Sequence, residues 1–290
     1  MITIENQQLQ ATFSTLGAEL ISLKGKKTNI EYIWNGNPEF WNRHAPVLFP
    51  FVGRLKDNQY HFDGKTYQMG QHGFARDMEF TITQQGPTDI TFTLVSDEKT
   101  KANYPFDFQL NIRYSVGGDG LMVVYEVVNT GTDEMYFSIG GHPAFKVPLE
   151  AGLNFEDYFL DFSPKKSRTK LPLAGPYIDL DQRTLAQTNT AISLSHALFK
   201  EDALVFETRG LNSYTIASEK SEHSVTLSYS DMNFVGIWSP YPKEAPFVCI
   251  EPWCGVADIL ETTGELSEKF GIKHLASQGK FTTKYAITVK

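Results

Sequence analysis

Glycine- and aspartate-rich turns divide this chain into short runs of β-forming residues. Residues 108–116 and 121–128 are joined by Gly-Gly-Asp-Gly, and residues 59–62 and 65–68 flank Asp63-Gly64. Turns of this composition adopt the left-handed backbone conformations that connect neighbouring antiparallel strands. The pattern therefore predicts β-hairpins and restricts the chain to architectures built from antiparallel sheets.

Alternating or short apolar runs predict further strands at residues 9–14, 18–24, 89–94, 155–161, 204–208, 214–217, 225–229, 234–238, 247–251 and 285–289. One helical turn is expected within 96–104, where Ser96 or Asp97 offers an N-cap side chain. The proline-bearing region 164–190 is predicted to form long loops. Because no convincing amphipathic helix, low-complexity linker or internal repeat interrupts the pattern, we expect one all-β domain over residues 1–290, with large packed antiparallel sheets.

Composition argues against several classes of protein. The net charge is −8 and the pI about 5.4, so we expect no binding to nucleic acid or to an anionic membrane. No apolar run approaches about 18 residues and no basic-then-apolar segment opens the chain, which predicts neither a membrane span nor a secretory signal, and hence a cytoplasmic location. Cys249 and Cys254 have no Cys or His partner at ligand spacing, which favours reduced thiols.

Three segments place ionisable residues among glycine and proline beside a predicted strand. His142 lies in Gly-Gly-His-Pro, and Glu251 is expected to end its strand because Pro252 follows it. Arg54 follows the apolar run 47–52, ahead of a Gln-His-Gly-Phe-Ala-Arg string. Charged groups at strand ends are well placed to line a cleft, so these segments are candidate site residues.

The chemistry of this set favours proton transfer. A histidine titrates near neutral pH and a desolvated glutamate can act as a general base, so His142 opposite Glu251 could move protons without a cofactor. These two residues and His72 could also bind zinc. No local ligand pair such as His-x-x-x-His supports a metal, and no Gly-x-Ser-x-Gly motif indicates a serine hydrolase. We therefore expect an acid–base site with no metal and no cofactor.

The order of these motifs resembles that of the aldose 1-epimerases, the galactose mutarotase-like family, and most closely its LacX-type branch. The shared features, spread over about residues 2–289, are Gly-Arg54 with Asn58, His72-Gly, His142-Pro-x-Phe145 and Cys-x-Glu251. This resemblance implies a single-domain β-supersandwich and an isomerase that interconverts the α and β anomers of a hexose. A non-catalytic carbohydrate-binding protein on the same fold is the alternative from another class.

The resemblance also implies catalytic roles. Glu251 would take the proton of the anomeric hydroxyl, and His142 would protonate the ring oxygen so that the ring opens. His72 would hydrogen-bond near the ring oxygen and stabilise the charge that develops there.

Substrate-binding roles follow from the same resemblance. Arg54 and Asp202 would bind the sugar, and Trp238 would line the pocket or pack in the core. Arg76 lies in a string similar to that of the hexose-6-phosphate 1-epimerases, and a guanidinium matches phosphate geometry. The expected partner is therefore a small sugar or a sugar phosphate.

Overall fold

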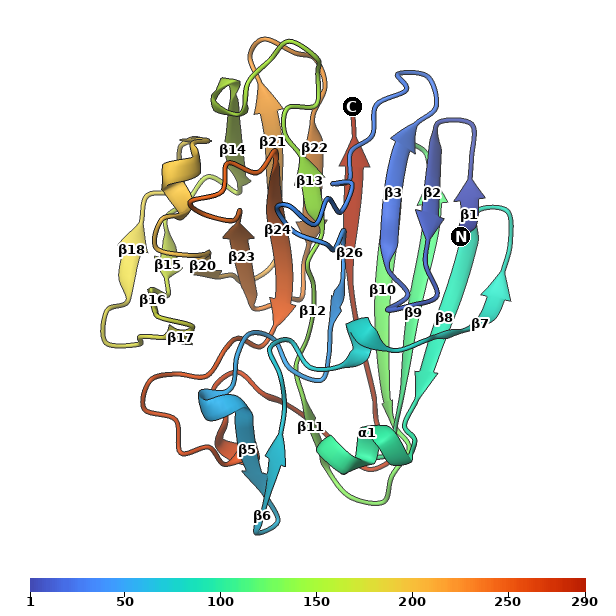
Figure 1. The fold of residues 1–290 in the computed structure, drawn as a ribbon, viewed down its shortest axis with the longest axis vertical. Coiled ribbons are helices and arrows are strands. Elements are labelled where there is room, and N and C mark those ends of the chain that lie inside the picture. The colour runs from blue at the N-terminus through green and yellow to red at the C-terminus, as the bar shows by residue number, and fades with distance from the viewer.

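The computed structural model describes residues 1–290, and its largest element is a nine-stranded antiparallel sheet (Figure 1). Across this sheet run β19 (Ile192–Ser193), β14 (Tyr158–Ser163), β21 (Asn212–Ser218), β22 (Val225–Tyr229), β26 (Lys280–Val289), β10 (Gly120–Asn129), β9 (Phe108–Gly117), β8 (Asp89–Val95) and β7 (Thr81–Gln85). Gly120 pairs with Gly117, so the predicted hairpin between β9 and β10 is confirmed.

A second large sheet has eight strands and lies in front of the first in the view of Figure 1. In order it contains β18 (Thr184–Ala186), β15 (Arg168–Lys170), β20 (Leu204–Glu207), β23 (Phe234–Trp238), β24 (Phe247–Cys254), β12 (Ile139–Gly141) and β4 (Val47–Leu48), with β13 (Ala144–Lys146) also paired to β24. Every residue of β24 is buried, because this strand lies in the middle of the sheet.

Pro252 does not end β24, contrary to the sequence-based expectation. The partner strand on one edge is broken between β12 and β13, and the Ile250 N–H on that edge donates to the carbonyl of Pro143 at 3.2 Å. Alternate residues of a strand face the same edge, so the nitrogen of Pro252 also points toward the break. No carbonyl of a paired strand requires an N–H there, and the missing N–H of proline is therefore tolerated. Glu251 therefore lies within the strand rather than at its end.

Smaller elements complete the fold. A three-stranded sheet contains β1 (Ile2–Glu5), β2 (Leu9–Phe13) and β3 (Leu20–Gly25), and the two-stranded pairs are β5 (Gln59–Phe62) with β6 (Lys65–Gln68), β11 (Met135–Phe137) with β25 (Lys273–Leu275), and β16 (Leu173–Ala174) with β17 (Tyr177–Ile178). The α-helix is α1 (Glu98–Asn103), and 3-10 turns span Lys56–Asn58, Ala75–Asp77, Phe155–Asp157, His196–Phe199 and Leu266–Glu268. None of the helices has the length and apolar character that a membrane span requires.

Local capping explains where the single α-helix begins. The side chain of Asp97 accepts a hydrogen bond from the Thr100 N–H at 2.8 Å, and the Thr100 hydroxyl accepts one from the Asp97 N–H at 2.9 Å. This reciprocal pair is a capping box, which satisfies two backbone donors of the first turn. The expected helical turn with Asp97 as its N-cap is confirmed.

Two further predictions from the sequence are wrong. The region 164–190 contains four strands of two or three residues, β15 to β18, rather than only long loops. β15 pairs with β20 from a distant part of the chain, so its sequence alone carries no strand signal. Residues 155–157 form a 3-10 turn ahead of β14, not the start of the strand.

Aromatic contacts join the sheets. The rings of Phe162 on β14 and Phe206 on β20 lie 5.9 Å apart and connect the two large sheets. Those of Phe13 on β2 and Tyr114 on β9 lie 4.5 Å apart and connect the three-stranded sheet to the nine-stranded one. A hydrophobic cluster of 60 buried residues extends through both layers. The predicted all-β fold of large antiparallel sheets is confirmed.

Candidate active site

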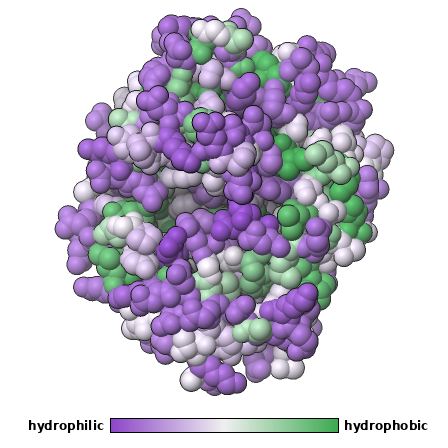
Figure 2. Space-filling model, viewed as in Figure 1, coloured by the Kyte–Doolittle hydropathy of each residue, from purple (hydrophilic) through white to green (hydrophobic).

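A cavity of about 420 Å³ opens over the eight-stranded sheet. Figure 2 shows a hollow in the middle of this face, with hydrophilic residues around it. The cavity is lined by all seven residues that the sequence singled out: Arg54, His72, Arg76, His142, Asp202, Trp238 and Glu251. The fold thus brings together residues that are far apart in the chain.

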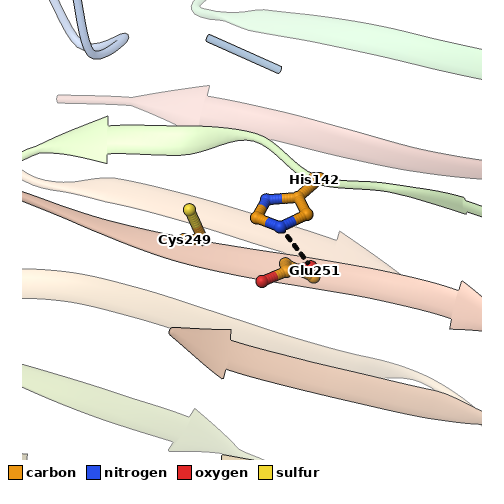
Figure 3. A group of neighbouring side chains, drawn as sticks. All are labelled: His142, Cys249 and Glu251. Carbon is orange, nitrogen blue, oxygen red and sulfur yellow. Dashed lines mark ion pairs between the residues drawn. The ribbon is translucent and has the colours of Figure 1, made fainter. Parts of the chain in front are cut away.

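Glu251 and His142 face each other at the base of this cavity (Figure 3). Glu251 projects from β24 and is 2% exposed, while His142, 7% exposed, lies in the break between β12 and β13. Oε2 of Glu251 lies 3.1 Å from Nε2 of His142. Oε2 is not in line with a ring N–H, so this contact is not a hydrogen bond, and Oε2 has no other hydrogen-bond partner. Each group therefore keeps hydrogen-bonding capacity for a ligand.

Burial shifts the two pKa values in opposite directions. Desolvation raises the pKa of Glu251 well above its ordinary value, and the negative charge of Asp202 adds to this shift. Desolvation and the positive charge of Arg76 lower the pKa of His142 to about 3. Over a wide pH range the pair therefore holds one proton between its two members.

His72 approaches the Glu251–His142 pair from the side, and its ring centre lies 5.6 Å from that of His142. The Gly53 N–H donates to Nδ1 of His72 at 3.0 Å, which places the proton of a neutral ring on Nε2. His72 and Gly73 have φ angles of 67° and 72°, and a Cβ on Gly73 would lie 2.3 Å from the carbonyl oxygen of Phe49. Glycine is therefore required after His72 for the loop to hold this imidazole in place.

Aromatic side chains surround His142. The Trp41 ring stacks on the imidazole at a centroid distance of 4.8 Å, and the Trp238 ring meets it edge-on at 5.8 Å. Sequence reasoning anticipated Trp238 but missed Trp41, which comes from an irregular segment near Asn35-Gly-Asn-Pro38. No local feature of the sequence marked Trp41, because its turn-rich segment has the composition of an ordinary loop.

Three arginines line one wall of the cavity. Arg54 donates to the side-chain oxygen of Gln71 at 3.0 Å, and Arg76 donates to the Gln71 carbonyl at 2.7 Å. Arg43, which sequence reasoning missed, pairs with Asp77 at 2.8 Å. Burial and the neighbouring Arg43 lower the pKa of Arg76 to about 10, so its guanidinium stays charged at neutral pH. This wall favours a ligand with negative or hydrogen-bond-accepting oxygens.

The remaining predicted residue, Asp202, lies on a turn before β20. Its φ of 70° is in the left-handed region, and its carboxylate accepts a hydrogen bond from the Ala203 N–H at 2.8 Å. Asp202 is exposed and lies at the cavity, as expected for a residue that contacts a ligand. The apolar part of the wall comes from the β16–β17 hairpin and includes Leu173 and Ile178.

Five buried polar atoms of the lining residues have no hydrogen-bond partner. They are Oε2 of Glu251, Nδ1 of His142, Nε of Arg54, Nε of Arg76 and Nε1 of Trp253. Buried polar atoms in folded proteins are nearly always paired. Their concentration around one cavity indicates a ligand rich in polar groups.

One group of side chains has the composition of a metal site. Ligand atoms of His142, Cys249 and Glu251 lie within 4.8 Å of one another (Figure 3). The fit is poor, because Cys249 is fully buried and does not line the cavity, whereas His142 and Glu251 do. Both cysteines are free, as the sequence predicted.

The fold defines the class of protein. A solved structure of a galactose mutarotase related enzyme from Lactobacillus acidophilus superposes with a TM-score of 0.98 at 42% identity, over 100% of this chain and 97% of that one. The architecture is therefore that of the galactose mutarotase-like proteins.

Sequence comparisons identify the family. The family model described as Aldose 1-epimerase matches residues 1–270. The chromosomal Protein LacX of Lactococcus lactis subsp. lactis is 32% identical over 99% of both chains. A putative glucose-6-phosphate 1-epimerase of Salmonella typhimurium is 28% identical over 56% of this chain and 54% of its own length. This chain belongs to the aldose 1-epimerase family, and the predicted resemblance to its LacX-type branch is confirmed.

Proposed function

We propose that this protein is a cofactor-independent mutarotase that interconverts the α and β anomers of a hexose. The observation that carries the proposal is the buried contact of 3.1 Å between Glu251 and His142 at the base of a polar cavity. A binding protein has no need of an acid and a base held together, whereas ring opening requires both. Membership of an isomerase family supports the same conclusion.

Ring opening uses the pair as base and acid. Glu251 accepts the proton of the anomeric hydroxyl, and the electron pair of that O–H bond forms the C1 carbonyl as the bond from C1 to the ring oxygen breaks. His142 donates its proton to the departing ring oxygen. Rotation about the C1–C2 bond presents the other face of the aldehyde, and the reverse transfers close the other anomer.

The pair needs one shared proton throughout this cycle. Opening starts from a carboxylate and an imidazolium, and the open-chain aldehyde then faces a carboxyl and a neutral imidazole. Burial alone favours the second form, because it raises the pKa of Glu251 and lowers that of His142. A closed sugar whose anomeric hydroxyl donates to Glu251 favours the first form. The two forms differ only in where the proton sits.

Neighbouring residues supply binding and charge stabilisation. His72, with its ring proton on Nε2, would donate toward the ring oxygen as charge develops there. Arg54 and Asp202 would hydrogen-bond sugar hydroxyls, and Trp41 and Trp238 offer apolar faces to the C–H surface of the sugar.

Polarimetry of freshly dissolved α-D-glucose and α-D-galactose, with excess chelator present, tests the proposal. We expect acceleration of mutarotation in proportion to enzyme concentration, with no loss on addition of chelator. A rate that chelator abolishes would instead indicate a metal-dependent enzyme. Sugar binding without acceleration would indicate a carbohydrate-binding protein.

The arginine wall favours a second candidate substrate, a hexose 6-phosphate. Arg43 and Arg76 contact the carboxylate of Asp77 at 2.8 Å and 3.8 Å, and the charge of Glu19 also acts on Arg76. With Arg54, the three guanidinium groups of this wall outnumber these two carboxylates, so the wall keeps a net positive charge. Guanidinium groups bind phosphate oxygens through paired, charge-assisted hydrogen bonds. The partial similarity to the Salmonella protein supports the same candidate.

Replacing Arg76 with methionine is expected to separate the two substrates. Loss of one guanidinium should lower kcat/KM for hexose 6-phosphates about tenfold more than for free hexoses, the usual effect of a charge-assisted contact. Rapid polarimetry or exchange NMR on both substrate types would measure the ratio. Arg113→Met is the matched control. Arg113 pairs with Asp89 at a distance of 3.7 Å and does not line the cavity. An equal loss for both substrates would argue against phosphate binding at Arg76.

A bell-shaped pH dependence of kcat/KM with a broad plateau is also expected. A second proton enters the pair at His142, whose lowered pKa of about 3 places the acid limb below the ordinary histidine range. The last proton leaves Glu251, whose raised pKa moves the basic limb above the ordinary carboxyl range. Rates from about pH 2 to about pH 10, corrected for spontaneous mutarotation, would check both limbs. A single limb near about 6.5, the ordinary histidine value, would contradict the shared proton.

A further inference from the structure

A buried ion pair lies behind the cavity wall. The Nζ atom of Lys269 is 3.0 Å from Oδ1 of Asp258 and donates to the carbonyl of Val256 at 2.8 Å. Asp258 is 3% exposed and Lys269 is 6% exposed. Taking two charges out of water costs free energy that their attraction often only balances. General stability is therefore a weak explanation for the pair.

Asp258 connects two separate parts of the cavity wall. Its N–H donates to the carbonyl of Arg54 at 3.0 Å, and its Oδ2 accepts the Lys56 N–H at 2.8 Å. Its own carbonyl accepts the N–H of Ile178, on the β16–β17 hairpin, at 2.9 Å. One residue thus holds the loop that carries Arg54 and the hairpin that supplies the apolar wall.

Close backbone packing links the segment around Asp258 to the wall of the cavity. Gly53 has a φ of 76°, and a Cβ there would lie 2.6 Å from Cα of Ala257. Ala257 itself lines the cavity, and Arg54, which follows Gly53, lines it as well. A shift at Asp258 would therefore move groups on both sides of a bound sugar.

We propose that the Asp258–Lys269 pair is a positioning device that fixes the Arg54 loop and the β16–β17 hairpin at the separation a hexose requires. Lys269 neutralises the carboxylate through Oδ1, so that Oδ2 can hold the Lys56 N–H in a buried setting. The pair acts on substrate binding and leaves proton transfer between Glu251 and His142 unchanged. As a proposal about substrate affinity, it rests on the proposed function.

Substitution of Lys269 tests this role through the split between KM and kcat. Lys269→Met leaves the buried carboxylate of Asp258 unpaired. Because small misplacements of binding groups weaken binding, we expect KM to rise about tenfold. The value of kcat should stay within about twofold of the wild type. Asp258→Asn keeps an acceptor for the Lys56 N–H and should raise KM by a smaller factor. The double variant Asp258→Asn/Lys269→Met carries no unpaired charge and should recover part of the loss.

Arg168→Met controls for loss of stability. Arg168 is another buried cation, 3% exposed, bound to Asn212 at 3.0 Å and Thr188 at 3.1 Å, and it does not line the cavity. This control should lower the melting temperature with KM unchanged. If Lys269→Met behaves like the control, or if it lowers kcat at constant KM, the positioning role is wrong.

Calorimetric titration with glucose and galactose separates this proposal from the proposed function. Sugar binding without turnover in the wild type would overturn only the mutarotase assignment. The Kd values of the variants would then still test the positioning role of the Asp258–Lys269 pair. A wild type that binds neither sugars nor sugar phosphates would overturn both. If Lys269→Met does not fold, Asp258→Asn provides the same comparison.

Discussion

Replacing Glu251 with glutamine is expected to lower turnover by about 100-fold or more, the usual contribution of a positioned base. Glutamine has nearly the same shape but cannot take up the anomeric proton. The fold should tolerate the change, because burial already favours the uncharged form of this side chain. Polarimetry at saturating sugar would measure the loss, and KM should change little, since the amide retains a hydrogen-bonding group at the same place.

Glu207→Gln is the matched control for this variant. Glu207 ends β20, two strands from β24 in the same sheet, and does not line the cavity, so its replacement should leave turnover close to that of the wild type. Near-native turnover in Glu251→Gln would overturn the assignment of the base. A loss confined to KM would place Glu251 in binding rather than in proton transfer.

The contrast between the two glutamates illustrates what the sequence could and could not predict. Glu251 stood out because the sequence predicted an ionisable residue at the end of an apolar strand, before Pro252, where it could line a cleft. Its exact place in the strand was predicted wrongly, because Pro252 normally ends a ladder. Only the break between β12 and β13, a feature of tertiary pairing, makes proline acceptable there.

Features set by neighbouring residues were predictable. Asp63 and Gly64 adopt φ angles of 49° and 69°, and the hairpin that they form is the one that their sequence predicts. The helical turn at Asp97 likewise follows from a side chain that bonds three residues along the chain. Such contacts depend little on the rest of the fold.

Features set by distant contacts were not predictable. Ile178 belongs to a strand of two residues that is held by the Asp258 backbone, and Trp41 reaches the site because it stacks on His142. Neither segment carries a local pattern that distinguishes it from a loop. Arg43 escaped notice for the same reason, since only the fold brings it beside Arg76 and Asp77.

Replacing His142 with asparagine is the second substitution with a large expected effect, again about 100-fold or more in turnover. Asparagine can fill part of the imidazole volume and donate a hydrogen bond, but it cannot carry the proton to the ring oxygen. The Trp41 ring would lose its stacking partner, so the melting temperature should also be measured. Turnover should be compared below the melting temperature of both proteins.

His274→Asn provides the matched control, because Nδ1 of His274 lies 3.5 Å from a carboxylate oxygen of Glu134 in an exposed pair. That variant should keep full turnover, which would show that proximity of a histidine to a glutamate is insufficient without burial in the cavity. The double variant Glu251→Gln/His142→Asn should be little slower than either single variant, because an acid and a base that share one proton act as a unit. Losses that multiply in the double variant would mean that the two residues act independently, and the shared-proton mechanism would then be wrong.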